Sequence, residues 1–372
     1  MKILFLARYL PQEGSTTHIY TLSKELIKRG HEVHLMSSGP SNEDAAVNIF
    51  NEAIEMGMKH HIIGFPNSPK FNLIGKFTQL IKYILASPKA LYIMHKIKPD
   101  VVHVHYPVTS YIAKLYKMLT GKKFVTTHHI SGIPKHPLHK KADYVVAISQ
   151  ELKKELVEKF SYSDNQIRLI FNGVSAEVFD RVVDEQKKFM IRKELSLPND
   201  MPIIGFVGSL NYRKGIDVLL EACSLIDGNF HITLLGDGDN NWVNSLIEKN
   251  DLKGKVSIFP FQNPINFYSI FDVFVLPSRK EGFPLVPLEA MMMGVPTIRS
   301  NVEGSSDQII NGVNGYIFKS EDSKELAEYI KLLLDDEKLR NNMANNAKNQ
   351  AKSKFTEKIM MDKLIDLYKE TL

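Results

Sequence analysis

The chain alternates short, continuously apolar runs with amphipathic segments of helical period, and it does so twice. Strands that are apolar on both faces must be covered on both sides, and strands that alternate with helices form parallel sheets. The pattern therefore predicts an α/β protein of two doubly wound domains. The expected strands of the first half are Lys2–Ala7, Glu32–Ser37, His61–Phe65, Val101–Tyr106, Lys123–His128, Tyr144–Ile148 and Ile167–Phe171. Those of the second half are Ile203–Val207, Phe230–Leu235, Val256–Phe259, Val273–Leu276 and Pro296–Ile298.

The length of the chain supports this division. With about 100–200 residues per domain, a chain of 372 residues has room for two domains. The stretch 176–200 is charged and shows no strand pattern, so we expect it to connect a domain over 1–175 to one over 201–355. We also expect a terminal helix near 356–372 to pack back onto the first domain. Ligands of doubly wound domains bind at the carboxyl ends of the strands, so the two sheets should face a central cleft.

Charge is distributed unevenly along the chain. Residues 1–180 hold 23 Lys and Arg against 15 Asp and Glu, whereas residues 181–372 hold 24 against 27. Twelve of the 13 His also lie in the first half. This basic excess favours an anionic partner, although an ordinary solvated surface explains it equally well. It is dispersed and belongs to no recognised nucleic-acid-binding module, so we expect no nucleic-acid partner.

The sequence also indicates a cytoplasmic protein. The single cysteine, Cys223, cannot form a disulfide within the chain and is expected to fill the core. The apolar run at 1–8 is too short for a signal peptide, and no stretch approaches the roughly 20 apolar residues that span a bilayer.

A basic loop follows the predicted strand Ile203–Val207. Gly208 lets the backbone approach an anion, and Arg213 and Lys214 then supply two cations suited to phosphate. The loop matches neither a dinucleotide fingerprint nor a Walker loop. Taken alone, such a loop is more often a plain surface feature than a binding site.

Two carboxylates follow the strand Val273–Leu276. Glu281 should lie in a loop and Glu289, eight residues later, inside the next helix. The helix N-terminus between them would favour an anion, and the carboxylates suit the hydroxyls of a ribose and of a sugar. A capping glutamate and a surface glutamate explain the same residues about equally well.

Together these segments resemble retaining GT-B glycosyltransferases of glycosyltransferase family four. The segment Glu281 to Glu289 is similar to the E-x7-E motif of that family. Further similar segments, in the same order as in the family, are 28–33 (KRGHEV), 172–174 (NGV) with Phe179, 208–215, 236–238 (GDG), 294–296 (GVP) and 312–315. Ser175 departs from the family pattern, which usually has Asp there. The resemblance implies two Rossmann-like domains and covers nearly the whole chain.

The resemblance implies a role for each matching residue. Arg213 and Lys214 would hold the diphosphate of a nucleotide sugar, with a UDP-sugar as the commonest donor, and neutralise the leaving group. Glu289 would bind the ribose and Glu281 the transferred sugar. The other implied donor-binding residues are Gly14, Gly208, Gly236, Phe283, Pro284 and Leu285. No metal or other cofactor is expected, since Asp237-Gly238-Asp239 is the only D-x-D candidate and lies in a turn that the family uses for the nucleotide.

The first half is expected to bind the acceptor, which would be a glycan or another anionic molecule. In the family a histidine ends the strand that matches Lys123–His128, and His128 fits that spacing best, with His129 as a rival. His18 and His105 are further candidates on the acceptor side. Gly14 is followed by Ser15 where the family usually has a second glycine, which weakens the assignment of Gly14.

One segment of the first half raises the question of membrane contact. The stretch 70–98 mixes lysines with apolar residues, so it could lie on anionic lipid as a peripheral contact. A helix whose apolar face joins the core is the favoured alternative.

Glycosyl transfer is not the only function that such a fold supports. A sugar phosphorylase or epimerase of the same fold, or a catalytically silent nucleotide-binding protein, remains an alternative.

Overall fold

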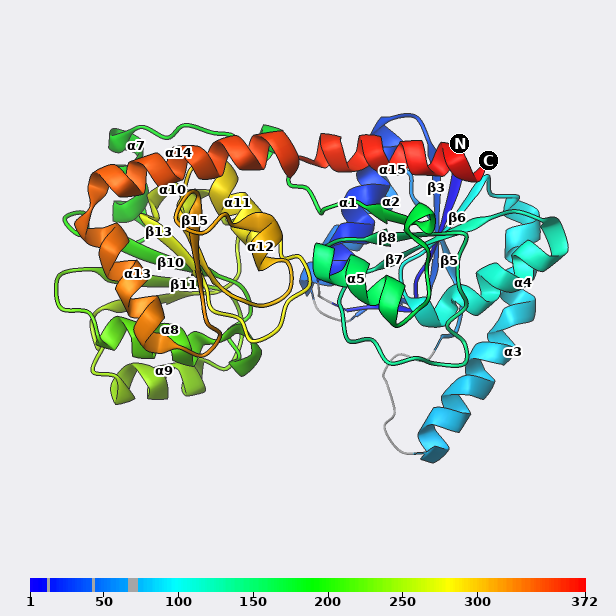
Figure 1. Cartoon of the computed structure of the whole chain (residues 1–372), viewed down its shortest axis with the longest axis horizontal. Helices are drawn as coiled ribbons and strands as arrows, with labels where there is room; N and C mark the ends of the chain where they lie inside the picture. Colours follow the sequence, from blue (N-terminus) through cyan, green and yellow to red (C-terminus); the bar gives the residue numbers. More distant parts are fainter. Residues whose placement is uncertain (12–13, 42–43, 66–72) are drawn as a thin grey trace. The chain divides into compact units, whose positions relative to one another are not determined.

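The computed structural model describes residues 1–11, 14–41, 44–65 and 73–372. The chain forms two compact units, one of Met1–Phe171 with Met360–Leu372 and the other of Asn172–Ile359 (Figure 1). Each unit is a parallel sheet with helices in its connections, which is the predicted α/β architecture. No helix of the described ranges is both long and apolar enough to cross a bilayer.

The first unit is built on a seven-stranded sheet in the order β5-β3-β1-β6-β7-β8-β9. Its strands are β1 (Lys2–Leu6), β3 (Glu32–Ser37), β5 (Lys59–Ile62), β6 (Val101–Val104), β7 (Phe124–His128), β8 (Tyr144–Ala147) and β9 (Ile167–Leu169), and β2 (Tyr9–Leu10) pairs separately with β4 (Gly39–Pro40). β1 pairs with β3 on one side and with β6 on the other. The strand order therefore reverses beside β1, which is where doubly wound sheets bind ligands.

The helices of the first unit are α1 (Gly14–Lys28), α2 (Asp44–Glu55), α3 (Leu73–Ile97), α4 (Ser110–Thr120), α5 (Gln150–Glu158) and most of α15 (Glu357–Thr371), with short 3-10 turns at Pro107–Thr109 and Asp164–Gln166. Figure 1 shows α1 and α2 on one side of the sheet and α3 and α4 on the other. Covered on both faces, β6 and β7 are buried along their whole length, and β1 is buried from Ile3 onward.

The C-terminal helix α15 belongs mainly to the first unit, although its sequence follows the second. Arg29 of the first unit pairs with Asp362 at 2.6 Å. Deeper in the unit, the Tyr368 hydroxyl lies 2.7 Å from Nδ1 of His103, whose Nε2 lies 2.7 Å from Oγ1 of Thr127. Both nitrogens of this fully buried imidazole therefore have partners, and α15 supplies one of them.

The second unit has a six-stranded sheet in the order β12-β11-β10-β13-β14-β15. Its strands are β10 (Ile203–Val207), β11 (His231–Leu235), β12 (Val256–Phe259), β13 (Val273–Leu276), β14 (Thr297–Ser300) and β15 (Gly315–Phe318). Its helices are α6 (Ala176–Phe179), α7 (Glu185–Glu194), α8 (Ile216–Ser224), α9 (Asn240–Lys249), α10 (Ile265–Ile270), α11 (Val286–Met292), α12 (Ser305–Gln308), α13 (Ser323–Asp335) and α14 (Glu337–Lys354), and a 3-10 turn, η3, spans Tyr212–Lys214. Cys223 is buried in this core.

Most strand ends lie within two residues of the predicted limits, and the larger departures are as follows. Residues 176–200, predicted to connect the domains, lie inside the second unit, because Ile191 of α7 is buried and Arg192 pairs with Asp272 at 3.3 Å. The strand predicted at His61–Phe65 begins at Lys59, because it is an edge strand whose exposed residues leave no apolar run. Neither β15 nor the short pair β2 and β4 was predicted.

Candidate active site

Three loops of the second unit meet at the carboxyl ends of β11, β10 and β13, neighbouring strands at which the strand order reverses. Gly236, after β11, lies so close to the loop after β10 that a Cβ there would be 1.9 Å from the carbonyl oxygen of Gly208. Gly238 approaches the carbonyl oxygen of Leu210 in the same way, at 2.1 Å. Only glycine permits this contact between backbones, so these glycines shape the edge that carries the predicted donor residues.

The predicted cation Lys214 and the predicted carboxylate Glu281 form a buried ion pair. Nζ of Lys214 donates to Oε1 of Glu281 at 2.5 Å, and the two side chains are 13% and 8% exposed. Lys214 stands in η3 after β10 and Glu281 follows β13, so the pairing of these two strands brings them together. Burial alone would raise the pKa of the Glu281 carboxyl, but the Lys214 ammonium and the charge of Arg213 hold that pKa below its ordinary value. Glu281 is therefore ionised, and its carboxylate can accept hydrogen bonds.

Arg213 is exposed on the same turn, with Nη1 3.5 Å from the carbonyl oxygen of Lys280. Arg279, a residue that the sequence analysis missed, holds this turn in place. Its guanidinium donates to both carboxylate oxygens of Asp217, at 2.8 and 2.7 Å, and to the carbonyl of Tyr212 at 2.7 Å. It also lies 3.7 Å from the centre of the Tyr212 ring. Because Asp217 neutralises Arg279, Arg213 is the cation of this group that remains exposed for a ligand.

Glu289 lies in α11, as predicted, and has a different environment from Glu281. The hydroxyl of Tyr268, from α10, donates to Oε2 of Glu289 at 2.8 Å. Burial raises the pKa of the Glu289 carboxyl to about 7, against the opposing effect of the hydrogen bond from Tyr268. Burial also raises the pKa of Tyr268 well above its usual value, so the phenol stays a donor. Near neutral pH, Glu281 is charged whereas Glu289 exchanges between its charged and neutral forms.

The segment between the two glutamates has its carbonyl groups bound within the unit. Nδ2 of Asn172 donates to the carbonyl of Phe283 and Nε2 of Gln308 to that of Pro284, both at 2.9 Å. Leu285 is the N-cap residue of α11. These bonds fix the backbone of the segment. A role of its amides toward a donor phosphate stays a prediction.

The D-x-D candidate serves the backbone of the second unit. Oδ1 of Asp237 accepts from the amide of Phe261 at 3.1 Å, and Oδ1 of Asp239 caps α9 by accepting from the amide of Trp242 at 3.0 Å. Within the described part of the chain, no three His, Cys, Asp or Glu side chains are arranged to hold a metal ion. Metal independence stays a prediction that chelation can test.

Four histidines of the first unit gather near the carboxyl end of its sheet. The ring centre of His105 lies 4.2 Å from that of His103, 5.5 Å from that of His129 and 5.9 Å from that of His18. Burial lowers the pKa of all four imidazoles, to about 4 for His18 and about 3 for His103. The predicted acceptor-side residues His18, His105 and His129 are thus close together, in a buried cluster that is neutral at physiological pH.

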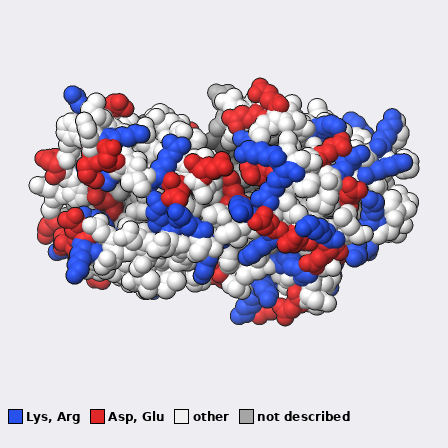
Figure 2. Space-filling model, turned by 90° about the horizontal axis from the view of Figure 1, so that it is seen from above, with Lys and Arg blue, Asp and Glu red and all other residues white. Residues whose placement is uncertain are grey.

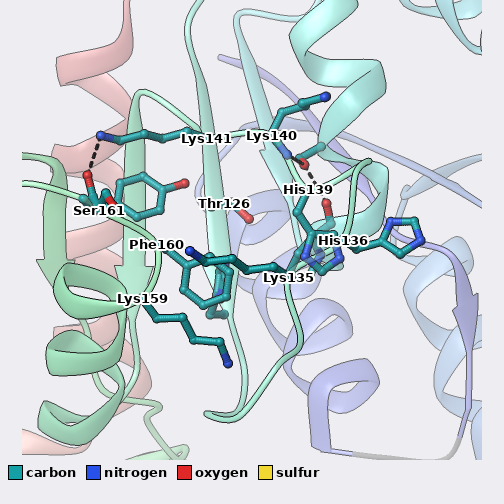
Figure 3. A pocket seen from close by; sticks show the side chains of 13 residues that line it. Thr126, Lys135, His136, His139, Lys140, Lys141, Lys159, Phe160 and Ser161 are labelled. Atoms are coloured by element: carbon teal, nitrogen blue, oxygen red, sulfur yellow. Dashed lines mark hydrogen bonds between the residues drawn. The ribbon is translucent and has the colours of Figure 1, made fainter.

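His128 and His129 are adjacent in sequence but have different surroundings. His128 lines a cavity of about 230 Å³, with its ring centre 5.3 Å from that of Phe160, whereas His129 belongs to the histidine cluster. Figure 3 shows the cavity with further side chains that line it, among them Lys135, Lys140 and Phe160. Gly14, also predicted near the donor, is an exposed residue at the start of α1 with open space around it, and residues 12 and 13 of that loop lie outside the described residues.

Both halves of the chain match known protein families. Residues 187–350 match the model of "Glycosyl transferases group 1", and residues 13–178 match that of "Glycosyltransferase Family 4". The first match contains Arg213, Lys214, Glu281 and Glu289, and the second contains His128.

Individual proteins agree with the family models. The chain is 28% identical to the capsular polysaccharide biosynthesis glycosyltransferase CapM of Staphylococcus aureus, over 94% of this chain and 96% of that protein. It is 30% identical to the N,N'-diacetylbacillosaminyl-diphospho-undecaprenol alpha-1,3-N-acetylgalactosaminyltransferase of Campylobacter jejuni, over 59% of this chain and 58% of that protein. The crystal structure of Anabaena HepE in complex with UDP has the same fold, with a TM-score of 0.82 at 18% identity over 100% of both chains. The chain is therefore a glycosyltransferase of the GT-B fold that resembles glycosyltransferase family four.

Proposed function

We propose that this enzyme moves a hexose-type sugar from a nucleotide diphosphate sugar, first of all a UDP-sugar, to a glycan or lipid-linked acceptor. We place this reaction in the cytoplasm, in the synthesis of a cell-surface polysaccharide. The carrying observation is the buried Lys214–Glu281 pair beside the exposed Arg213, at the carboxyl edge of a parallel sheet. The UDP bound to HepE supports the choice of donor, and the names of the Staphylococcus and Campylobacter relatives support the class of acceptor.

The proposed chemistry rests on fixed positive charge. A departing nucleoside diphosphate gains negative charge as the bond to the sugar breaks, and preorganised cations stabilise that charge. Arg213 and Lys214 would do so from η3, which Arg279 holds in place. Glu281, ionised by its contact with Lys214, would accept hydrogen bonds from hydroxyls of the transferred sugar, and Glu289 from the ribose. No metal is needed in this scheme.

His128 is the better of the two histidines predicted at the reaction centre. It lines an open cavity, whereas His129 is packed against other imidazoles. A neutral imidazole can donate one hydrogen bond and accept another, which suits a position beside an acceptor group. Retention of the anomeric configuration is proposed by analogy with the family, and NMR of the product linkage would test it.

The proposal is tested by donor binding and by turnover. Nucleotide sugars are screened for thermal stabilisation, and release of the nucleotide is then measured with the best donor. Arg213→Ala should lower the rate of transfer by about 10²–10³-fold, because one preorganised charge on the leaving group is lost. Lys280→Ala, which removes a neighbouring exposed charge, is the matched control. Equal rates in the two variants, or activity that requires Mg²⁺ or Mn²⁺ after EDTA treatment, would contradict the scheme.

A peripheral contact with anionic membrane is the second part of the proposal. Large apolar side chains are exposed on α3 and on its neighbour α4. Leu85 is 72% exposed and Tyr92 59%, and on α4 both Met118 and Leu119 are 72% exposed. Scattered apolar residues are normal on a surface, but a group on two packed helices is typical of an interaction site.

Basic residues accompany these apolar side chains. Lys82, Lys89 and Lys96 recur every seven residues on α3, are all exposed, and alternate along the helix with Leu85 and Tyr92. The opposite face of α3 is buried in the core, so the two predicted alternatives, core helix and lipid surface, are compatible. Lys70 lies outside the described residues. On the exposed face of α3, lysines alternate with apolar side chains. On the face of the molecule shown in Figure 2, acidic and basic side chains are instead interspersed over both units.

A further inference from the structure

The cavity that His128 lines is formed by four segments of the first unit, one of which is the turn before α4 with Pro107 and Ser110 (Figure 3). The end of β7 contributes Thr126 and His128. The loop between β7 and β8 contributes the residues around His139, and the segment after α5 contributes Lys159 and Phe160. All of these segments belong to one compact unit, so the cavity does not depend on how the two units are placed.

The residues that line this cavity are strongly basic. They include three histidines and four lysines, and none of them is acidic. The lysines are Lys135, Lys140, Lys141 and Lys159. Nζ of Lys141 donates to the carbonyl of Ser161 at 2.7 Å, and Lys159 pairs with Glu155 at 2.9 Å. Neither Lys135 nor Lys140 has an ion pair with any described residue, so two positive charges at the cavity have no neutralising partner.

Two buried imidazole nitrogens also lack partners there. His128 is only 4% exposed, and its Nδ1 has no hydrogen-bond partner among the described residues. Nδ1 of His139 is likewise buried and has no hydrogen-bond partner among the described residues. Buried polar atoms without partners are rare in folded proteins, and each calls for an explanation such as a ligand. Burial lowers the pKa of both imidazoles to about 4, so at neutral pH they offer hydrogen bonds and the lysines supply the charge.

We propose that this cavity binds a phosphoryl group of the acceptor. A phosphate monoester carries between about −1.5 and −2 charges and three strong acceptor oxygens. Such a group matches two unpaired lysines together with imidazole N–H donors, whereas a carboxylate would neutralise only one of the cations. Sites for drug-sized ligands measure about 300–1,000 Å³. A cavity of about 230 Å³ therefore suits a charged head group better than a whole acceptor.

This inference rests on the proposed function, because it assigns the phosphoryl group to the sugar acceptor. The donor diphosphate is assigned to Arg213 and Lys214 in the other unit, so the two anion sites have no residue in common. Binding at one can therefore be measured while the other is saturated.

The test is calorimetric titration of inorganic phosphate into the full chain at pH 7.5 and constant ionic strength, with UDP present in excess. We expect saturable binding that the double variant Lys135→Ala with Lys140→Ala weakens at least tenfold. The control is Lys154→Ala with Lys187→Ala, which removes the same charge from two exposed helix positions and should leave the affinity within twofold. Acetate, a carboxylate with a single negative charge, should bind at least tenfold more weakly than phosphate.

The outcomes separate the two proposals. Equal weakening in both double variants, no saturable phosphate binding, or acetate as tight as phosphate would overturn the phosphoryl site. Failure of UDP to bind would instead overturn the donor assignment, and the comparison of the two double variants would still report on the cavity. All the substituted lysines are exposed or lie at the cavity rim, and circular dichroism confirms that each variant is folded.

Discussion

Lys214 and Glu281 depend on each other, because each is a nearly buried charge whose main partner is the other. Removing one partner of a buried ion pair leaves an uncompensated charge, which costs far more than the pair contributes. The pair therefore has a structural role besides the one proposed toward the donor, and a loss of activity in a Lys214 variant has to be separated from a loss of folding.

We predict that Lys214→Met lowers the free energy of unfolding of the second unit by about 3 kcal/mol, because Glu281 is left buried and unpaired. Adding Glu281→Gln should restore most of that loss, since the neutral amide needs no counter-charge. Trp242, the only tryptophan, lies in the second unit, so its fluorescence during guanidinium denaturation reports on this unit. A double variant as unstable as the single one would contradict the coupling.

The proposed role of Glu289 predicts the sign of a pH dependence of nucleotide binding. With a pKa of about 7, its carboxyl is mostly protonated at pH 6 and mostly ionised at pH 8. If the ionised form holds the ribose hydroxyls, UDP affinity should rise up to about tenfold over this interval. Glu289→Gln should remove this rise and leave only the titration of UDP itself, as measured by calorimetry. Parallel pH profiles for wild type and variant would remove Glu289 from the ribose site.

Among the elements, α3 is the one with two separable faces, one in the core and one exposed. We predict that the chain co-sediments with vesicles containing anionic lipid and not with neutral vesicles, and that added salt weakens this binding. Each basic residue near an anionic surface contributes about 1 kcal/mol, and the attraction is screened over about 8–10 Å.

The decisive variant for this surface is Leu85→Ser with Lys89→Ala, because both residues are exposed and their loss leaves the core face intact. It should weaken vesicle binding at least tenfold. The matched control is Val157→Ser with Lys154→Ala on α5, where both residues are also exposed. Binding that is equal for the two variants, or equal for neutral and anionic vesicles, would rule out α3 as the contact.

Sequence patterns located the elements well where burial is continuous. Ile203–Val207 and Val273–Leu276, both buried along their whole length, have the predicted limits. The sequence pattern did not predict β15, because Gly315–Phe318 is short, half-buried and follows directly on a turn. The helices in 176–200 were not predicted, because few of their residues are buried in the core.

The partners of site residues were harder to predict than the residues themselves. Spacing placed Glu281 in a loop and Glu289 in a helix, and both placements are confirmed. The contacts of Glu281 with Lys214 and of Glu289 with Tyr268 join residues 67 and 21 positions apart, so they depend on which strands and helices are neighbours. For the same reason, spacing alone could not separate the surroundings of His128 from those of His129.

At the scale of the whole molecule, the first unit should be more sensitive to acid than the second. The buried histidines of the first unit have pKa values below that of an unfolded chain, about 6.5, so its unfolded state binds more protons between pH 6.5 and 4. Stability that is present above pH 6.5 is therefore lost as the pH falls. The second unit has a single histidine, His231, whose pKa burial also lowers, and the raised pKa of Glu289 opposes its effect because that carboxyl favours folding as the pH falls through 7.

We predict that lowering the pH from 7.5 to 5 destabilises the first unit, with His18 alone contributing about 2 kcal/mol. Circular dichroism reports the helices of both units and Trp242 fluorescence only the second, so the part of the circular dichroism transition that the fluorescence does not follow should shift to lower denaturant. His105→Asn should reduce the pH dependence of unfolding of the first unit. The control His95→Asn, at an exposed position, should not reduce it. Coincident acid shifts of the two signals would contradict the prediction.

The hydrogen bond between His103 and Tyr368 has a consequence for how the protein is made. Domains generally fold in the order in which the ribosome releases them. Here His103, buried in the first unit, pairs with the hydroxyl of Tyr368. The ribosome adds Tyr368 265 residues later, after the whole second unit has been synthesised. Until then the nascent first unit lacks α15, and the apolar surface that this helix covers is open to solvent and to other nascent chains. The unit that begins to be synthesised first therefore completes its core last.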